Sequence, residues 1–450
     1  MTSTALLTDH YELTMLQASL RSGTAHRRAV FELFGRRLPD GRRYGVTAGT
    51  GRMLDAVERF HFDDDSLAAL SDHHVVDQAT LDWLAGYRFN GDIWGYGEGE
   101  VYLPGSPLLV VESTFAEGVL LETLLLSIYN HDSAIASAAS RMTLAAEGRP
   151  CIEMGSRRTH EQAAVAAARA AYVAGFASTS NLAAGHAYGI PTAGTAAHSF
   201  TLLHDTERDA FQAQVDSLGA GTTLLVDTYD VAEAVRAGVE IAGTSLGAVR
   251  LDSGDLSDLA RRVRAQLDDL GATATRIVVT SDLDEFAIAG LSGAPVDGYG
   301  VGTALVTGSG HPTCGFVYKL VARTAGDDPD GPLVSVAKKS SDKISIGGRK
   351  WALRRRGADG IAQTEVLGIG APPVDDGDDR ELLVRLVEQG RTVGREPLSA
   401  ARDRHQRSVA ELPIEARHLS RGEPAIPTDY VGDGRAGSTR PFARAEEVRP

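Results

Sequence analysis

The stretch GAVRLDSGDLSDLARRVRAQLDDLGATATRIVVTSD, residues 247–282, contains the pattern that decides the fold. A short apolar run ends in polar residues, a segment with helical spacing follows, and a second apolar run again ends in polar residues. Asp255 stands where it can cap the amino end of the helix. Two strands joined through a helix predict a right-handed βαβ unit, whose parallel strands bring their polar carboxyl ends to one edge of the sheet.

The same alternation of strands and helices continues on both sides of this stretch. TTLLVDTYD, residues 222–230, precedes a helical segment, and VDGYGVGTAL, residues 296–305, closes the series. Further upstream, Thr159 and Gln162 predict a capping box at the start of an Ala-rich helix. We therefore expect residues 111–330 to form an irregular α/β barrel with its active site at the carboxyl ends of the strands.

The segments that flank this barrel have a mixed pattern. FELFGRRLP begins like a strand, and GEGEVYLPGSPLLVVEST, residues 97–114, predicts a hairpin with Pro104 and Gly105 in its turn. SVAKKSSDKISIGGRKWALRRR, residues 335–356, predicts antiparallel strands with basic turns. The fold class is therefore α/β, with two parts outside the barrel. The first is a second, mixed α/β domain, formed by residues 1–110 together with residues 331–430. The other is a disordered tail at residues 431–450.

Composition and charge exclude several classes of protein. The chain has 450 residues, 45 Lys and Arg against 60 Asp and Glu, and a net charge of −15, which argues against a binder of nucleic acids or membrane surfaces. Its two cysteines, Cys151 and Cys314, match no metal or redox spacing, and no apolar run is long enough to span a bilayer. We therefore expect a cytoplasmic protein whose phosphate-binding site is local, with a flexible acidic segment at residues 372–379.

Charged residues at the predicted strand ends favour an anion-binding site. In VRLDSGD, Arg250 can bind a carboxylate or a phosphate with both arms of its guanidinium, and Asp252 can hold a sugar hydroxyl, Mg²⁺ or a ring nitrogen. The alternative is that the two pair only with each other. In EMGSRRTHEQ, residues 153–162, two arginines precede a helix, where a bound anion would be favourable and a solvated pair is the alternative.

Glycines and hydroxyl residues at other strand ends predict a phosphate cradle. YGVGTALVTGSG offers backbone N–H groups, although a plain glycine turn would have the same composition. As a dinucleotide fingerprint it is weak, because Leu305 stands where the third glycine belongs. VTSDLDEF adds Ser281 and Asp282, with Asp284 as a competing helix cap.

Two further motifs carry groups that can serve either catalysis or structure. LLVDTYD offers Asp227 and Asp230, and we expect one of them to be only a helix cap. AGTAAHSF, residues 193–200, places His198 after a run of small residues. This histidine is either an ordinary hydrogen-bonded group or one with room for a ligand beside its ring. The sequence contains no nucleophile elbow, Walker A loop or HExxH motif.

Taken in order, these motifs closely resemble those of one family, nicotinate phosphoribosyltransferase. The resemblance covers most of residues 5–325 and is carried by TDHYELTM, FELFGRRLP, EMGSRRTHE, GTAAHS, RLDSGDL, TSDLDE, GVGTALVTG and FVYKLV. It implies a type II phosphoribosyltransferase of NAD salvage, which makes nicotinate mononucleotide and pyrophosphate from nicotinate and phosphoribosyl pyrophosphate. It also implies Mg²⁺ as cofactor and ATP as co-substrate, with ATP hydrolysis coupled through a phosphohistidine.

The same resemblance implies roles for individual residues. His198 would be phosphorylated and would act with Arg250 and Asp252 at the catalytic centre, where Asp252 would bind the ribose hydroxyls or Mg²⁺. Arg157 and Arg250 would bind the carboxylate and phosphates of the substrates. Tyr11 would stack on the pyridine ring from the second subunit of a homodimer with shared active sites. The ribose 5-phosphate and the remaining phosphate charge would be held by Ser281, Asp282, Gly302, Thr303, Arg36 and Lys319.

Two positions depart from the family's pattern and bear on the substrate. Met154 stands where relatives often carry an aromatic residue that sandwiches the pyridine ring, and a methionine can still pack on an aromatic face. Ser180 aligns with an aspartate of the similar nicotinamide enzyme, and a neutral serine favours a carboxylate and hence nicotinate. The alternatives are a nicotinamide or quinolinate phosphoribosyltransferase, the latter releasing CO₂, and a catalytically idle barrel that only binds phosphorylated metabolites.

Overall fold

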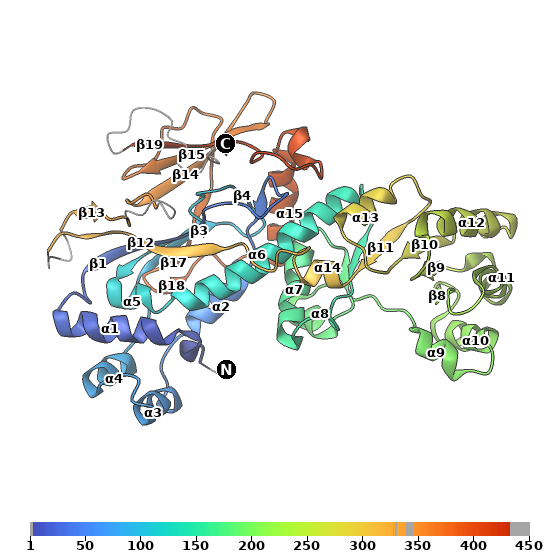
Figure 1. Cartoon of the computed structure of the whole chain (residues 1–450), viewed down its shortest axis with the longest axis horizontal. Helices are drawn as coiled ribbons and strands as arrows, with labels where there is room; N and C mark the ends of the chain where they lie inside the picture. The colour runs from blue at the N-terminus through green and yellow to red at the C-terminus, as the bar shows by residue number, and fades with distance from the viewer. Residues whose placement is uncertain (1–2, 327, 329–330, 339–344, 433–450) are drawn as a thin grey trace, which may run out of the picture. The chain divides into compact units, whose positions relative to one another are not determined.

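The structure is a computed structural model that describes residues 3–326, 328, 331–338 and 345–432 (Figure 1). The chain divides into two compact units by its internal contacts. One consists of Met1–Ala134 with Thr313–Pro450 and is called the terminal unit below. The other consists of Ile135–Pro312 and is called the central unit. Each unit is described by itself.

The central unit is built on a six-stranded sheet in which neighbouring strands are parallel. The order is β7-β6-β11-β10-β9-β8, so that β7 and β8 are the edges and the carboxyl ends of all the strands share one side. The predicted α/β fold class is confirmed, with the sheet forming an open, half-barrel version of the expected barrel. The strands are β6 (Cys151–Glu153), β7 (Ser178–Thr179), β8 (Thr223–Leu225), β9 (Ala248–Leu251), β10 (Arg276–Val279) and β11 (Gly298–Val301).

Helices join these strands, and aspartates cap three of them. Asp230, Asp255 and Asp284 each accept a hydrogen bond from a backbone N–H in the first turn of α11, α12 and α13. Asp227 and Asp282 are thereby left for other roles. The helices are α7 (Glu161–Val173), α8 (Leu182–Tyr188), α9 (His198–Leu203), α10 (Glu207–Leu218), α11 (Val231–Ala242), α12 (Leu256–Asp269), α13 (Glu285–Gly290) and α14 (Thr303–Val306).

The predicted capping box at Thr159 is wrong. The helix α7 begins at Glu161, so His160 occupies the cap position and its Nδ1 accepts the N–H of Gln162 at 3.3 Å. The hydroxyl of Thr159 stands one residue too early to reach the third N–H of the helix.

The terminal unit is built on a seven-stranded antiparallel sheet in the order β13-β12-β1-β5-β3-β17-β18. A four-stranded sheet, β16-β14-β15-β19, and a two-stranded sheet, β2-β4, belong to the same unit. The strands are β1 (Arg28–Gly35), β2 (Gly45–Val46), β3 (Asp92–Tyr96), β4 (Val101–Tyr102), β5 (Leu109–Thr114), β12 (Phe316–Thr324), β13 (Leu333–Ser335), β14 (Lys350–Arg356), β15 (Ala362–Ile369), β16 (Arg380–Glu381), β17 (Leu383–Glu388), β18 (Arg391–Thr392) and β19 (Thr428–Gly432).

The helices of the terminal unit come mostly from its first segment, and α6 begins in this unit and ends in the central one. Among the described residues, no helix combines the length and the apolar character that crossing a membrane requires. The helices are α1 (His10–Ser22), α2 (Thr50–Glu58), α3 (Asp64–Asp72), α4 (Gln78–Ala85), α5 (Phe115–Val119), α6 (Glu122–Ala145) and α15 (Leu398–Ala410).

Two strands of the terminal unit pair differently from the sequence prediction. β4 pairs with β2, whereas β5 pairs with β1 and β3, so residues 97–114 do not form a hairpin. Gly105 does make a turn, with φ of +86°, but both edges of β5 are occupied by other strands. Because β5 and β12 belong to this sheet, residues 111–134 and 313–330 lie in the terminal unit and not in the barrel.

The later segments of the terminal unit match their predictions in part. In the basic segment 335–356, β14 pairs with β15 in antiparallel fashion, and residues 339–344 lie outside the described residues. Val431 and Gly432, which the predicted tail includes, instead end β19 and pair in parallel with β15. The rest of that tail, residues 433–450, lies outside the described residues.

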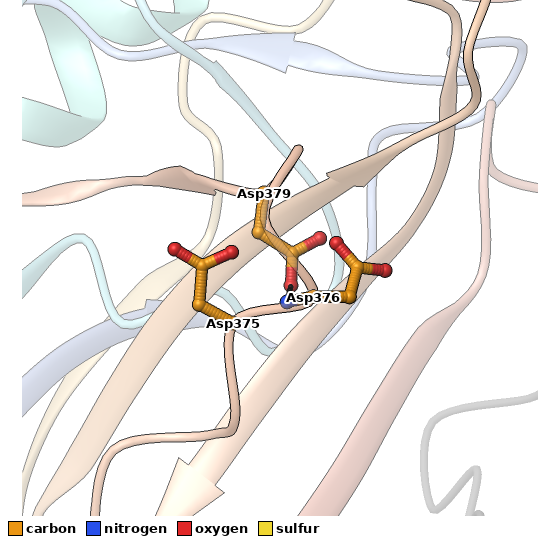
Figure 2. Close-up of side chains that lie close together, drawn as sticks. All are labelled: Asp375, Asp376 and Asp379. Atoms are coloured by element: carbon orange, nitrogen blue, oxygen red, sulfur yellow. Dashed lines mark hydrogen bonds between the residues drawn. The ribbon is translucent and has the colours of Figure 1, made fainter.

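Three acidic side chains of the segment 372–379 lie close together, as Figure 2 shows for Asp375, Asp376 and Asp379. The guanidinium of Arg355 on β14 forms ion pairs with Asp376 at 3.0 Å and with Asp379 at 2.8 Å. This cation lowers the pKa of Asp379 and accounts for the clustering of the carboxylates.

Candidate active site

A cavity of about 310 Å³ lies at the carboxyl ends of four strands of the central unit, β6, β9, β10 and β11. In a parallel sheet this is where ligands bind, because the loops that follow several strands converge there. The lining residues come from motifs that lie far apart in the sequence. They are Met154, Arg157, Arg158, Arg250, Asp252, Thr280, Ser281, Asp282, Gly300, Gly302 and Thr303.

Three arginines supply the positive charge of this cavity. Arg250 is the last residue but one of β9, and its side chain donates a hydrogen bond to the hydroxyl of Thr195 while its Nε is buried without a partner. Burial lowers the pKa of Arg250, while the nearby charges of Asp252 and Asp227, neither of them in contact with it, act in the opposite direction. In the part of the chain that the structure describes, none of these guanidiniums, including that of Arg158, forms a salt bridge with a carboxylate. The cavity therefore presents cations that no protein anion neutralises by direct contact.

A buried aspartate organises the loop after β9. The carboxylate of Asp227 accepts hydrogen bonds from the N–H of Asp252 at 2.9 Å and the hydroxyl of Ser253 at 2.7 Å. The Oδ1 of Asp252 in turn accepts a hydrogen bond from Thr280 at the end of β10. These bonds fix the Asp252 carboxylate at the rim of the cavity.

His198 does not line the cavity, but it is joined to it through the same aspartate. It is the first residue of α9, its side chain is 41% exposed, and its Nε2 lies 3.1 Å from Oδ1 of Asp227. Beyond it, Glu207 on α10 has a buried Oε1 without a hydrogen-bond partner. Burial, together with the charges of Asp227 and Asp230, raises the pKa of Glu207 to about 7. The surroundings of Glu207 thus contain the carboxylates of Asp227 and Asp230, whereas the cavity is lined by three guanidiniums.

The phosphate-cradle motifs contribute Ser281, Asp282, Gly302 and Thr303 to the lining of the cavity. Ser281 has φ of +119°, a conformation that a residue with a side chain adopts only when its surroundings impose it. Gly300 is required by close packing, because a Cβ there would lie 2.8 Å from the sulfur of Met154 and 2.5 Å from Cγ2 of Thr280. The side chain of Met154 is thus held against the glycine strand at the floor of the cavity.

Ser180, the residue predicted to select the ring substituent, is not among the residues that line the cavity. It follows β7, and its N–H donates to the carbonyl of Glu153, directly before Met154, at 2.8 Å. It is therefore bonded to the strand that carries the first of the cavity residues.

The three remaining predicted residues, Tyr11, Arg36 and Lys319, belong to the terminal unit. Tyr11 on α1 is 44% exposed, and burial together with Glu122 raises the pKa of its hydroxyl. Nζ of Lys319 lies 3.5 Å from the carboxylate of the same Glu122. The guanidinium of Arg36 lies 5.8 Å from the ring centre of Phe34. Their roles toward a substrate stay predictions.

Four residues of this region were not predicted as site residues, and each had a signal in the sequence. Arg158 and Thr280 are direct neighbours of Arg157 and Ser281, and Gly300 opens the same glycine motif as Gly302. Asp227 was one of two candidates in LLVDTYD, and the structure separates them, because Asp230 caps α11.

Comparisons with known proteins agree with this geometry. The model of the nicotinate phosphoribosyltransferase (NAPRTase) N-terminal domain matches residues 6–130. Nicotinate phosphoribosyltransferase pncB1 of Mycobacterium tuberculosis is 59% identical over 435 residues, 95% of each chain, and nicotinate phosphoribosyltransferase of Bacillus subtilis is 37% identical over 78% of this chain and 73% of its own. The crystal structure of human nicotinic acid phosphoribosyltransferase superposes with a TM-score of 0.78 at 27% identity, covering 94% of this chain and 97% of the human one.

Proposed function

The chain belongs to the nicotinate phosphoribosyltransferase family, and on this premise we propose that it forms nicotinate mononucleotide and pyrophosphate from nicotinate and phosphoribosyl pyrophosphate. The observation that carries the proposal is the cavity with Arg157, Arg158 and Arg250 around it and no carboxylate in salt-bridge contact with them. Both substrates are anions, and guanidiniums that lack carboxylate partners are matched to phosphate and carboxylate groups.

The proposed reaction requires anion clamps and does not require a general base. The pyridine nitrogen attacks C1 of the ribose with its own lone pair, the bond from C1 to the pyrophosphate oxygen breaks, and pyrophosphate departs with that electron pair. Positive charge develops on the sugar and negative charge on the leaving group, so Asp252 can stabilise the first and the arginines the second. Holding both substrates in line supplies much of the remaining rate.

Mg²⁺ is a further part of the proposal, and the residues present fit it. The carboxylates of Asp252 and Asp282 line the same cavity as the arginines, and Mg²⁺ binds one or two carboxylates together with phosphate oxygens and water. Asp252 would hold the ion; when bound, the ion would neutralise charge on the leaving pyrophosphate.

We also propose that ATP phosphorylates His198. Asp227 holds Nε2 of the imidazole, which leaves Nδ1 to take the γ-phosphoryl group as ADP departs. There is open space beside the preceding segment, since a Cβ on Gly194 would meet no atom within 4 Å. The phosphoryl group would add negative charge next to Asp227, which also fixes Asp252, and near Thr195, which binds Arg250. Water would later release it as phosphate.

Selectivity for nicotinate and the shared sites of a homodimer complete the proposal. Ser180 is neutral, so a substrate carboxylate near it meets no repulsion. Tyr11 is half-exposed on α1, close in sequence to the exposed apolar side chains of Leu7 and Met15. A Tyr11→Ala subunit and a His198→Ala subunit should therefore restore ATP-stimulated activity when mixed, because one of the two shared sites is then intact. Mixed subunits that stay as impaired as either variant alone would contradict sharing.

The direct test is mononucleotide formation from phosphoribosyl pyrophosphate with nicotinate, nicotinamide or quinolinate, each with and without Mg-ATP. We expect nicotinate to be strongly preferred and its turnover to rise with ATP. Turnover of nicotinamide would overturn the selectivity assigned to Ser180, and release of CO₂ from quinolinate would indicate the decarboxylating enzyme. No turnover of any substrate would favour a barrel that only binds phosphorylated metabolites.

A further inference from the structure

On the basis of the proposed function, we propose that Glu153 is a positioning residue, which fixes the spacing between the arginine turn and the ring-binding end of the active site. Glu153 is the last residue of β6 and is fully buried, directly before Met154. It does not line the cavity.

The environment of Glu153 is unusual for a buried carboxylate. Burial raises its pKa, and the only opposing contributions come from hydrogen bonds to Thr179 and Gly155, with no cation among them. By contrast, Glu285, a buried carboxylate of the same unit, pairs with Arg141 at 3.0 Å. Burying a carboxylate without such a partner costs free energy. The two hydrogen bonds, from Thr179 and Gly155, offset part of this cost and fix the position of the carboxylate.

Each of these hydrogen bonds ties Glu153 to a segment that carries a proposed binding residue. Oε1 accepts the N–H of Gly155, which opens the turn that contains the two arginines, and the N–H of Arg158 returns to the carbonyl of Gly155 at 2.8 Å. Oε2 accepts the hydroxyl of Thr179, the residue before Ser180. One carboxylate therefore holds both segments at a fixed distance from each other.

A third segment is packed against the same point. A Cβ on Gly155 would lie 2.2 Å from Cγ1 of Val306 and 3.1 Å from the carbonyl oxygen of Gly302, so Gly155 fits closely against the glycine loop. Because Glu153 holds Gly155, it also fixes the distance between the turn that carries Arg157 and Arg158 and the glycine loop at Gly302. Because in-line transfer depends on alignment at the scale of an ångström, a shift here should reduce turnover more than binding.

The direction of the hydrogen bond to Thr179 makes the proposal testable with small changes. Oγ1 of Thr179 accepts the N–H of Asn181 at 2.9 Å, so its own proton is the one directed at Glu153. In Glu153→Gln the side-chain carbonyl can still accept from Gly155, but the amide group cannot accept the proton of Thr179. Thr179→Val removes the same bond from the other side at nearly constant volume, together with the acceptor for the N–H of Asn181, and Thr179→Ser keeps both bonds.

We expect Glu153→Gln and Thr179→Val each to lower kcat by roughly 10- to 100-fold while the KM values for both substrates change by less than about threefold. The double variant should lose no more than Thr179→Val alone, because both changes remove the bond between Glu153 and Thr179. Thr179→Ser should retain kcat. Glu285→Gln is the matched control, since it alters a buried carboxylate of the same unit that is bonded to Ser309 and Arg141. It should lower the melting temperature without lowering kcat.

The outcomes separate this inference from the proposed function. An inactive wild-type enzyme in the mononucleotide assay overturns the proposed function. An active wild type with unchanged kcat in Glu153→Gln and Thr179→Val overturns the positioning role alone. The role is also overturned if Glu285→Gln loses as much kcat as Glu153→Gln at an equal loss of melting temperature, because Glu153 would then contribute only stability.

Discussion

Each unit of the molecule has a cavity lined by three arginines, and the two cavities use these arginines differently. The cavity of the terminal unit measures about 550 Å³ and includes Arg28, Arg349 and Arg385. Arg349 lies 3.9 Å from the ring centre of Trp351, and its Nε is 3.1 Å from Glu112. Arg28 is 3.4 Å from the same carboxylate, and the guanidinium of Arg385 lies 4.6 Å from the ring centre of Trp94. Here every guanidinium has a carboxylate or an indole of the protein as its partner.

In the central unit the corresponding partners are missing among the described residues. The cavity there is smaller, at about 310 Å³, has no aromatic lining, and its arginines make no salt bridge. Cavity size and arginine content therefore do not separate a binding site from a structural cluster. The partners of the cations do, because a guanidinium that already has an anion and an aromatic face stabilises the fold, and one without them is available to a ligand.

The largest expected effect is that of removing Arg250. Arg250→Ala should lower kcat/KM for mononucleotide formation by about 10²- to 10³-fold, since a group aimed at substrate charge is lost. Its thermal unfolding should change little, because one hydroxyl is its only hydrogen-bond partner in the described chain. Arg250→Lys keeps the positive charge but loses the two-armed hydrogen bonding of the guanidinium. Its kcat/KM should therefore lie between those of wild type and Arg250→Ala. Steady-state kinetics and a melting curve on each variant test this, and an unchanged kcat/KM would remove Arg250 from the site.

A second effect separates the cavity from the histidine next to it. His198→Ala should abolish the stimulation by ATP and leave a slower, ATP-independent transfer, because the phosphoryl acceptor is lost while the cavity stays intact. Initial rates with and without Mg-ATP measure this. Equal stimulation in variant and wild type would exclude His198 as the acceptor.

The terminal cavity should show the opposite behaviour to the central one. Arg349→Ala leaves Glu112 with only the more exposed Arg28 as a cationic partner and should lower the free energy of unfolding by about 2 kcal/mol. The kcat/KM of the folded fraction should stay within about twofold of wild type. Denaturant titration and kinetics on the same preparation test both statements. A large kinetic loss with unchanged stability would break the comparison, because this cavity would then be a binding site as well.

The smallest expected effect concerns the unpaired carboxylate beside the central cavity. Glu207 has a pKa of about 7 in the folded protein against an ordinary 4.5, so the folded state binds more protons than the unfolded state between these pH values. Its contribution to stability therefore falls as the pH rises from about 4.5 to about 7. Glu207→Gln should flatten this part of the curve of stability against pH. The same slope in both proteins would show that Glu207 ionises freely.

Much of the active site was predictable because parallel strands bring their carboxyl ends together. Arg250 follows one apolar run and Ser281 the next, so their proximity needs only the strand–helix alternation. The choice between Asp227 and Asp230 was not predictable, since an aspartate suits a helix cap and a catalytic partner equally well. Glu153 escaped prediction because its partner, Thr179, lies on another strand.

The fold outside the barrel was less predictable for a similar reason. The hairpin expected at residues 97–114 does not form, because β5 pairs with β1 and β3 and not with the strand before its nearest turn. Glu32 on β1 pairs with Lys319 on β12, and in the sequence the whole central unit lies between these two residues. No local sequence pattern encodes this register.

This register between β1 and β12 also has a consequence for how the protein is made. β1 leaves the ribosome early, whereas β12 follows only after the entire central unit has been translated. At ~5–20 residues per second the wait is on the order of tens of seconds. During this interval one edge of the apolar strand AVFELF has no partner, and an open apolar edge invites pairing with other chains. Synthesis therefore includes a stage in which this edge of the nascent terminal unit is open to pairing.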